Sequence, residues 1–408
     1  MLWRQRMQEN NFKFGVFNGW LVLLADGLMN PSIVIAAFAT QLGASNITIG
    51  LIPALSAGMW FLPQLYVASI VRSYPRKLPV YNKMAKIRTT MYMCLALTSF
   101  LFIDHPSLLL TLFMLCIAGS ALAAGITGLP WLEVVSKTIP QQERPMFFGI
   151  RNLGGGILAF GAGILVRFIM DSDLQFPYNY SLIFFVGGLI YTAGYAIFGR
   201  VQEPDEPVQP RSNVLEDIKN IPNMLRKDPE LRRFLVARAF VAIAGIAEPF
   251  FAVYALKNLH MEQNFIGYFL MVIAGVVPLS NLFWTWIGTD KGSRRVMRIA
   301  TSIAVLAPVV ALFTPPELPV MYLLVFVLYS MAQQGYGLAF GSYTLNISPA
   351  HDRSRYLGTM NTLMGFMVFA PVAGGLIADH SGFHAVFYVS ICAFVLAWLF
   401  QSKLRKDA

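Results

Sequence analysis

Long apolar runs, separated by short polar intervals, extend through the whole chain. Residues 27–71, for example, contain no charged side chain. A run of more than about 18 apolar residues indicates a transmembrane helix rather than a helix buried in a soluble core. The pattern predicts twelve such helices, at residues 15–39, 48–71, 87–104, 107–135, 146–168, 181–200, 232–257, 264–287, 296–314, 318–341, 356–379 and 384–401.

The only long polar interval lies between the sixth and seventh predicted helices. It covers residues 201–231 and contains an amphipathic stretch from Val214 to Leu225. Asp228 and Pro229 then supply an N-cap and a first-turn proline for the seventh helix. We therefore expect a six-helix bundle over residues 1–200, a cytoplasmic linker over 201–231 and a second six-helix bundle over 232–408.

The two predicted bundles show weak internal similarity, as expected of a membrane protein built from repeated halves. One alignment pairs Pro140 with Pro349, Arg144 with Arg353, Gly149 with Gly358, Asn152 with Asn361, and Gly156 with Gly365. Chance similarity between glycine-rich apolar helices is the alternative explanation. The expected fold class is thus an all-α integral membrane protein with twelve transmembrane helices in two pseudo-symmetric six-helix bundles.

The composition excludes a soluble globular protein and a disordered one. Residues of the AVILMFWYC class make up 56% of the 408 residues, and charged residues make up only 13%, against about 25% in soluble domains. The three cysteines all lie within apolar runs, so they predict no disulfide framework.

The positions of Lys and Arg predict the orientation in the membrane, because short cytoplasmic loops are enriched in both. With the N-terminus inside, most basic residues fall on the cytoplasmic side. These include Arg4, Arg6 and Lys13; Arg72, Arg76, Lys77, Lys83, Lys86 and Arg88 in the loop between helices 2 and 3; Lys291, Arg294, Arg295 and Arg298; and Lys403, Arg405 and Lys406. The net charge of +10 therefore reflects topology, and no nucleic-acid partner is expected.

The loop between predicted helices 8 and 9 reads Gly288-Thr-Asp-Lys-Gly-Ser-Arg-Arg295. With the twelve helices and the repeated halves, this loop resembles the G-x-x-x-D-R-x-G-R-R motif of the major facilitator superfamily, with shifted glycines. The resemblance covers essentially the whole chain. It implies gating roles for Asp290, Arg294 and Arg295, with the acid latching one transport state against a helix terminus. The loop between helices 2 and 3 keeps only the basic pair Arg76-Lys77.

Ionisable residues inside predicted spans are costly, so each is a candidate functional residue. Asp26 lies near the middle of the first helix, and Glu248 precedes Pro249 in the seventh, where a bend is expected. Either carboxylate is expected to bind a proton or substrate, or else to pair with a neighbour. Arg238 is a third candidate. Arg151 and Glu133 lie near the inner ends of consecutive helices, where they are expected to form an ion pair or a gate.

Uncharged polar and aromatic residues recur at helical spacing and are candidates to line a cavity. The alternative role for each is hydrogen bonding between helices. The candidates are Asn30, Trp60, Gln64, Asn152, Asn281, Trp284, Gln333, Tyr336 and Asn361.

These features predict a secondary transporter that moves a small organic solute by alternating access, driven by protons through Asp26 or Glu248. An exporter of multiple drugs or amphipathic compounds and an uncoupled facilitator are the alternatives. Metalloprotease, serine-hydrolase and P-loop motifs are all missing from the sequence, so we expect no enzyme activity, metal or cofactor. We expect a monomer, surrounded by lipid, in a bacterial cytoplasmic membrane with both termini in the cytoplasm.

Overall fold

The computed structural model describes residues 2–61, 67, 71, 73–206, 214–349 and 353–405. Within these ranges it leaves out the side chains of 2–7, 61, 145, 214–220, 289–291, 345, 353–355, 357, 358, 361 and 362. The regular elements of the described residues are all helices. Among them, nine stretches are long and apolar enough to cross a membrane. The expected all-α membrane fold is confirmed, and these stretches are consistent with twelve spans.

The chain divides into two compact units by its internal packing. Unit 1 consists of residues 1–38, 55–214 and 266–271, and unit 2 consists of residues 39–54, 215–265 and 272–408. Each unit includes a segment from elsewhere in the chain: residues 39–54 pack within unit 2, and residues 266–271 pack within unit 1.

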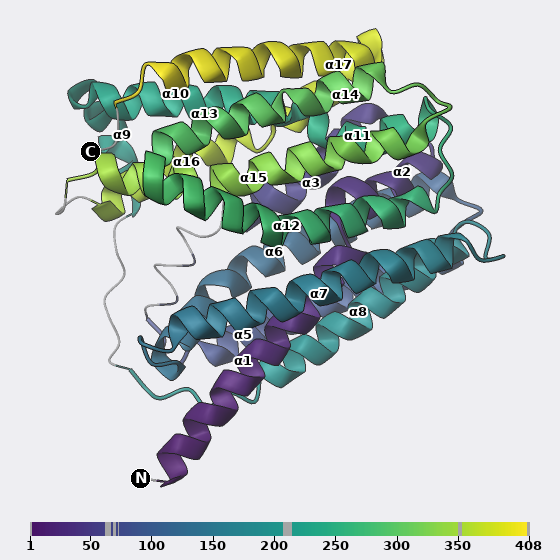
Figure 1. The fold of residues 1–408 in the computed structure, drawn as a ribbon. Helices are drawn as coiled ribbons and strands as arrows, with labels where there is room; N and C mark the ends of the chain where they lie inside the picture. Colours follow the sequence, from purple (N-terminus) through teal and green to yellow (C-terminus); the bar gives the residue numbers. More distant parts are fainter. Residues whose placement is uncertain are drawn as a thin grey trace. The chain divides into compact units, whose positions relative to one another are not determined.

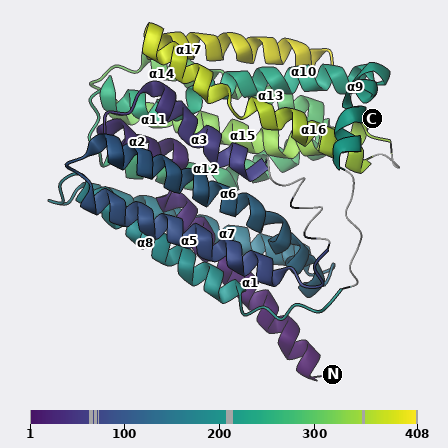
Figure 2. The ribbon, with the colours of Figure 1, turned by 180° about the vertical axis from the view of Figure 1, so that it is seen from behind.

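Five long helices build unit 1 (Figures 1 and 2): α1 (Leu2–Leu28), α5 (Leu78–Leu101), α6 (Pro106–Thr138), α7 (Arg144–Met170) and α8 (Tyr178–Phe198). Helix α1 packs against α7 and α8, and α5 packs against α6 and α8. Glycines allow the closest of these approaches, since a Cβ atom at Gly154 or Gly155 would overlap Trp20 or Leu23 of α1.

A break at Asn30 and Pro31 divides the first predicted span. Helix α1 ends at Leu28, and the chain continues as a π-helix (Pro31–Ile35) and α2 (Ala36–Gln41). Oδ1 of Asn30 accepts hydrogen bonds from the backbone N–H groups of Ser32 and Ile33, each at 3.1 Å. Asn30, a predicted cavity residue, therefore caps the second part of this span.

Helix α5 corrects the sequence prediction for the third span. It begins at Leu78, nine residues before the predicted start at residue 87. Lys83, Lys86 and Arg88 made this segment look like a loop, but all three belong to the helix. The guanidinium of Arg88 consequently lies near the middle of a 24-residue helix, not in the loop between helices 2 and 3.

Unit 2 contains the remaining helices, apart from residues 266–271 at the start of α12 (Figure 1). They are α9 (Val214–Lys227), α10 (Pro229–Ala244), α11 (Glu248–Lys257), α12 (Phe265–Lys291), α13 (Ser293–Ala304), α14 (Leu306–Phe313), α15 (Pro319–Ile347), α16 (Arg353–Met367) and α17 (Ala370–Ser402), with the first part of α3 (Asn46–Phe61). Asp228 caps α10 by accepting hydrogen bonds from the backbone N–H groups of Glu230 and Leu231, as predicted.

Two irregular points in unit 2 agree with the sequence. A short 3-10 turn (Gly245–Ala247) separates α10 from α11 directly before Glu248 and Pro249, where the proline predicted a bend. Gly382 interrupts α17 with φ of 78°, a conformation that glycine adopts at little cost. This interruption lies between the predicted eleventh and twelfth spans.

Candidate functional site

Unit 1 contains a cavity of about 510 Å³ that is lined by both apolar and charged side chains. Three of the predicted site residues, Asp26, Trp60 and Arg151, line it together with ten other residues: Asn18, Val22, Tyr81, Arg88, Thr127, Gly128, Leu129, Trp131, Leu132 and Tyr195. Its volume lies within the range of about 300–1,000 Å³ that is typical of small-molecule sites.

Arg88 is the central polar group of this cavity wall. Its Nη2 lies 3.5 Å from Oδ1 of Asp26 and donates to the Tyr191 hydroxyl at 3.0 Å, and its Nη1 donates to the Tyr195 hydroxyl. The guanidinium also lies 4.5 Å from the centre of the Tyr191 ring, a favourable cation–π distance. The Tyr191 hydroxyl in turn donates to Asp26. Helices α1, α5 and α8 are thereby joined by one hydrogen-bond network.

The charged groups of this network differ in accessibility. The Asp26 side chain is 46% exposed and the Arg88 side chain is 13% exposed. The carboxylate is therefore the more exposed member of the pair.

Arg151 of α7 lies on the same cavity but has a different environment. Its guanidinium lies 4.9 Å from the Trp131 ring centre, and Nη1 donates to Oδ1 of Asn152 at 3.2 Å. Gly19 of α1 makes room for it, because a Cβ atom there would lie 2.1 Å from Cγ of Arg151. The predicted ion pair with Glu133 is not formed, since Glu133 lies 3.8 Å from Nζ of Lys77 instead.

Sequence reasoning missed Arg88, Tyr191 and Tyr195. The usable signal was a pair of one-turn spacings: Arg88 precedes Tyr92 by four residues, and Tyr191 precedes Tyr195 by four residues. An arginine with aromatic residues at helical spacing forms a surface on which the guanidinium can stack. The rings of Tyr92 and Tyr191 do stack, with centroids 4.8 Å apart and planes inclined by 3°.

In unit 2, Glu248 forms a separate polar group with residues of α15. The Tyr329 hydroxyl donates to Oε2 of Glu248 at 3.0 Å, and Nε2 of Gln333 donates to the same hydroxyl at 2.5 Å. Arg238 of α10 lies 4.7 Å from the Phe340 ring centre. Among the described residues, Arg238 has no hydrogen-bonding or ion-pair partner, and its Nε is buried.

Other predicted cavity residues of unit 2 belong to its apolar core. Trp284 is fully buried, and its Nε1 donates to the backbone carbonyl of Met331 at 2.7 Å. Tyr336 is also buried, and its hydroxyl donates to Oγ1 of Thr301. Asn281 and Gln333 are exposed, as is Asn152 of unit 1. Gln64 and the side chain of Asn361 lie outside the described residues.

Comparison with known families identifies the chain. The model of the major facilitator superfamily matches residues 15–369 and again residues 245–407. The chain belongs to this superfamily of membrane transporters. It is accordingly an integral membrane transporter rather than an enzyme, and its substrate is a small molecule. No curated protein matches its sequence.

Solved structures of superfamily transporters share the fold at low sequence identity. A mutant of the nucleoside transporter NupG aligns with a TM-score of 0.74 and 14% identity, over 98% of this chain and 100% of that chain. A POT family transporter in complex with 5-aminolevulinic acid aligns with a TM-score of 0.72 and 13% identity, over 97% of this chain and 96% of that chain. A bacterial homologue of the iron transporter ferroportin, in its inward-facing state, aligns with a TM-score of 0.70 and 13% identity, over 98% of both chains.

The superfamily's loop motif is only partly represented in the structure of this chain. The side chain of Asp290 lies outside the described residues. Arg294 donates to the backbone carbonyls of Gln401 and Ser402 at the end of α17, where a cation is favourable. Arg295 is exposed. The loop before α5 lacks the motif's acid, but a carboxylate from another segment docks there.

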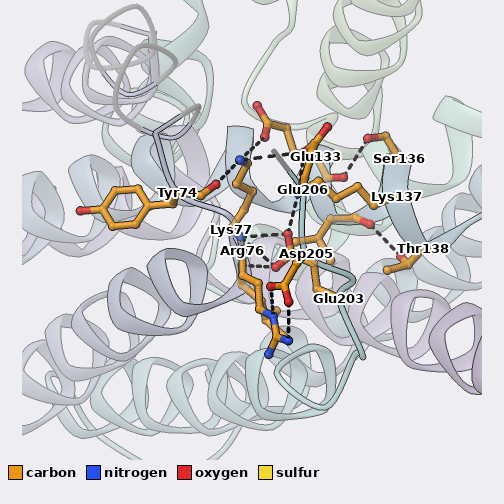
Figure 3. Close-up of polar contacts among 12 residues, drawn as sticks. Tyr74, Arg76, Lys77, Glu133, Ser136, Lys137, Thr138, Glu203, Asp205 and Glu206 are labelled. Atoms are coloured by element: carbon orange, nitrogen blue, oxygen red, sulfur yellow. Dashed lines mark hydrogen bonds and ion pairs between the residues drawn. The ribbon is translucent and has the colours of Figure 1, made fainter. Parts of the chain in front are cut away.

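That carboxylate belongs to Glu203, which follows α8 in the predicted linker (Figure 3). It accepts hydrogen bonds from the backbone N–H groups of Lys77 at 2.8 and 2.9 Å and of Leu78 at 2.7 Å. Its side chain is 1% exposed and lies 3.0 Å from Nζ of Lys137, at the end of α6. Glu203 therefore caps the start of α5 and links it to α6.

Two further acids of the same segment are exposed at this cluster (Figure 3). Asp205 and Arg76 form an ion pair at 2.6 Å, and the hydrogen bond from Arg76 lowers the pKa of Asp205. Glu206 lies 2.8 Å from Nζ of Lys137, and the hydrogen bond from Lys137 lowers the pKa of Glu206. Residues 203–206 are thus anchored to unit 1 by charge.

Proposed function

We propose that this chain is a proton-coupled secondary transporter that moves a small organic solute by alternating access. Asp26 is the coupling carboxylate in this proposal. The observation that supports it most directly is the contact of Asp26 with Arg88 and Tyr191 on the wall of the 510 Å³ cavity. A carboxylate at membrane depth is costly unless it is used or paired, and here it is both paired and accessible.

The charged and titratable groups around Asp26 come from three helices. Arg88 lies on α5, Tyr191 on α8 and Arg151 on α7. Ionised Asp26 compensates the charge of Arg88. Protonation of Asp26 removes that negative charge and frees the guanidinium to make another interaction. Binding of a proton and rearrangement at Arg88 are thereby linked.

Glu248 is the second candidate carrier, and we assign it a supporting role. Its carboxylate accepts a hydrogen bond from Tyr329, which is itself held by Gln333. This arrangement fixes the position of α11 relative to α15. It is therefore suited to holding the break between α10 and α11 in place within unit 2.

In the proposed transport cycle, the predicted bundles 1–200 and 232–408 rock about a central site, connected by the cytoplasmic linker 201–231. The distribution of Lys and Arg supports cytoplasmic termini. We propose a monomer in a bacterial cytoplasmic membrane. The proposed gating residues of the second bundle are Asp290, Arg294 and Arg295. In the first bundle, the proposed gating residue is Glu133, which pairs with Lys77.

Ligand binding is the test of this function. The full-length protein in detergent is screened by thermal unfolding against sugars, nucleosides, amino acids, organic anions and lipophilic cations at two pH values. A ligand at about 100 times its dissociation constant adds about 2.7 kcal/mol of stability. The proposal predicts a ligand whose affinity depends on pH in the wild type and not in Asp26→Asn. A pH dependence unchanged in Asp26→Asn would contradict the role of Asp26.

A further inference from the structure

The charges that line the unit 1 cavity do not balance. Among its lining residues, the structure describes one carboxylate, that of Asp26, and two guanidinium groups, those of Arg88 and Arg151. Asp26 lies beside Arg88, which leaves the positive charge of Arg151 without a carboxylate partner among the described residues. An uncompensated charge in a low-dielectric region is costly, so it is retained where a ligand supplies the opposite charge.

Arg151 also has unused hydrogen-bonding capacity. A guanidinium carries five N–H donors, whereas Arg151 makes a single hydrogen bond with the described residues, to Oδ1 of Asn152. Among the described residues, no acceptor reaches the buried Nε atoms of Arg88 and Arg151 or the buried indole N–H of Trp131. The cavity wall therefore has an excess of donors as well as an excess of positive charge.

The position of Arg151 is defined by its surroundings. The guanidinium stacks on Trp131, and the missing side chain of Gly19 leaves space for its aliphatic part. A stacked guanidinium presents its N–H groups in a plane, which suits the oxygens of a carboxylate or phosphate. Trp60, Tyr81 and Trp131 supply aromatic surface on the same cavity, which suits an organic body attached to the anionic group.

We infer that the transported solute is an organic anion whose carboxylate or phosphate group binds Arg151, with Arg88 as the second cation. This inference names the substrate class for the transport proposed above and rests on that proposal. It also bears on the coupling: protonation of Asp26 releases Arg88 from its carboxylate partner, so both guanidinium groups are then available to the anion and proton and anion bind together.

The experiment uses matched pairs of anionic and neutral probes on the full-length protein. Succinate is compared with succinamide, benzoate with benzamide, and glycerol 3-phosphate with glycerol, by thermal unfolding and by calorimetry. We expect an anion to bind and its neutral counterpart to bind at least 10-fold more weakly. Comparing the affinities of succinate and benzoate with that of glycerol 3-phosphate shows whether the site prefers a carboxylate or a phosphate group.

Variants of Arg151 connect the binding to this site. Arg151→Gln is expected to weaken the bound anion about 10- to 100-fold, as for loss of a charge-assisted hydrogen bond, and Arg151→Lys is expected to weaken it less. The matched control is Arg167→Gln. Arg167 lies on the same helix, sixteen residues or about 24 Å away, and stacks on Tyr268 outside the cavity. The Arg167→Gln substitution is expected to leave the affinity for the anion unchanged.

The unfolding temperature of Arg151→Gln without ligand shows whether a loss of binding results from misfolding. Because Arg151 has no carboxylate partner among the described residues, Arg151→Gln is expected to unfold at the same temperature as the wild type or at a higher one. Neutral probes that bind as tightly as their anions, an unchanged affinity in Arg151→Gln, or no binding by any anion of the series would each overturn the inference. If a neutral solute is transported with coupling that depends on Asp26, the anion inference fails and the transport proposal stands.

Discussion

Nη2 of Arg88 lies 3.5 Å from Oδ1 of Asp26, and this contact joins the middle of α5 to α1 on the wall of the unit 1 cavity. Both charged groups lie within helices of a membrane transporter. Two hydroxyl groups, of Tyr191 and Tyr195, complete the surroundings of the guanidinium. Arg88 therefore keeps two tyrosine hydroxyl partners, besides Asp26, that do not depend on the charge of the carboxylate.

Substitution of Gly19 tests whether the position of Arg151 matters. Gly19→Ala places a methyl group within 2.6 Å of Cγ, Cδ and Nε of Arg151, so the side chain must leave Trp131. We expect the affinity for the bound anion to fall about 10-fold, measured by calorimetry, with a small change in unfolding temperature. A fall in unfolding temperature without any loss of affinity would show that Gly19 serves packing alone.

Gly125 of α6 provides a test of packing in unit 1. An added Cβ atom would lie 2.4 Å from the backbone carbonyl oxygen of Met59 and 2.8 Å from that of Trp60, and backbone atoms cannot rotate away. Gly125→Ala is expected to reduce the free energy of unfolding by about 1–3 kcal/mol. Gly149→Ala is the control, because open space surrounds Gly149. Equal stability of the two variants would contradict the close packing of α6 on residues 59–60.

Glu203 is expected to stabilise the start of α5. Glu203→Ala removes a buried acceptor of two backbone N–H groups and the partner of Lys137, so the free energy of unfolding should fall by about 3 kcal/mol. Asp205→Asn changes an exposed ion pair and should have little effect. Thermal unfolding of both variants makes the comparison. A Glu203→Ala variant as stable as Asp205→Asn would show that the docked segment is dispensable.

The Glu206–Lys137 pair predicts a pH dependence with a defined sign. The pKa of Glu206 is lowered below its ordinary value of 4.5 by the hydrogen bond from Lys137. The stabilisation is therefore fully present above pH 4.5 and is lost as the pH falls through the lower pKa of the folded protein. The wild type should unfold at a higher temperature than Glu206→Gln at neutral pH, and the difference should vanish in acid. A difference that is independent of pH would exclude this ion pair as its cause.

The sequence predicted the elements that depend on hydropathy and on local chemistry. The cap at Asp228 and the bend before Pro249 both follow from neighbouring residues. The start of α5 was misplaced, because three cations in one helical segment resemble a loop until the tyrosines of α8 are known to surround Arg88. Docking of Glu203 on α5 joins residues 126 positions apart, and no local pattern encodes such a contact.

The candidate site could be predicted only in part for the same reason. Asp26 was identified because an acid in an apolar helix stands out from its neighbours. Trp284 matched the stripe of candidate cavity residues equally well, yet its ring is fully buried in the core. Helical spacing defines a face of a helix, and only the packing of the other helices decides whether that face meets a cavity or a core.

The most direct test of the central claim is concentrative transport by Asp26→Asn. The ligand identified by thermal unfolding is supplied, radiolabelled, to proteoliposomes of the wild type and the variant with an imposed proton gradient. The account predicts that the wild type accumulates the ligand above its external concentration. Asp26→Asn should only equilibrate it, while still exchanging labelled for unlabelled ligand across the membrane. Accumulation by Asp26→Asn to the wild-type level would contradict the account.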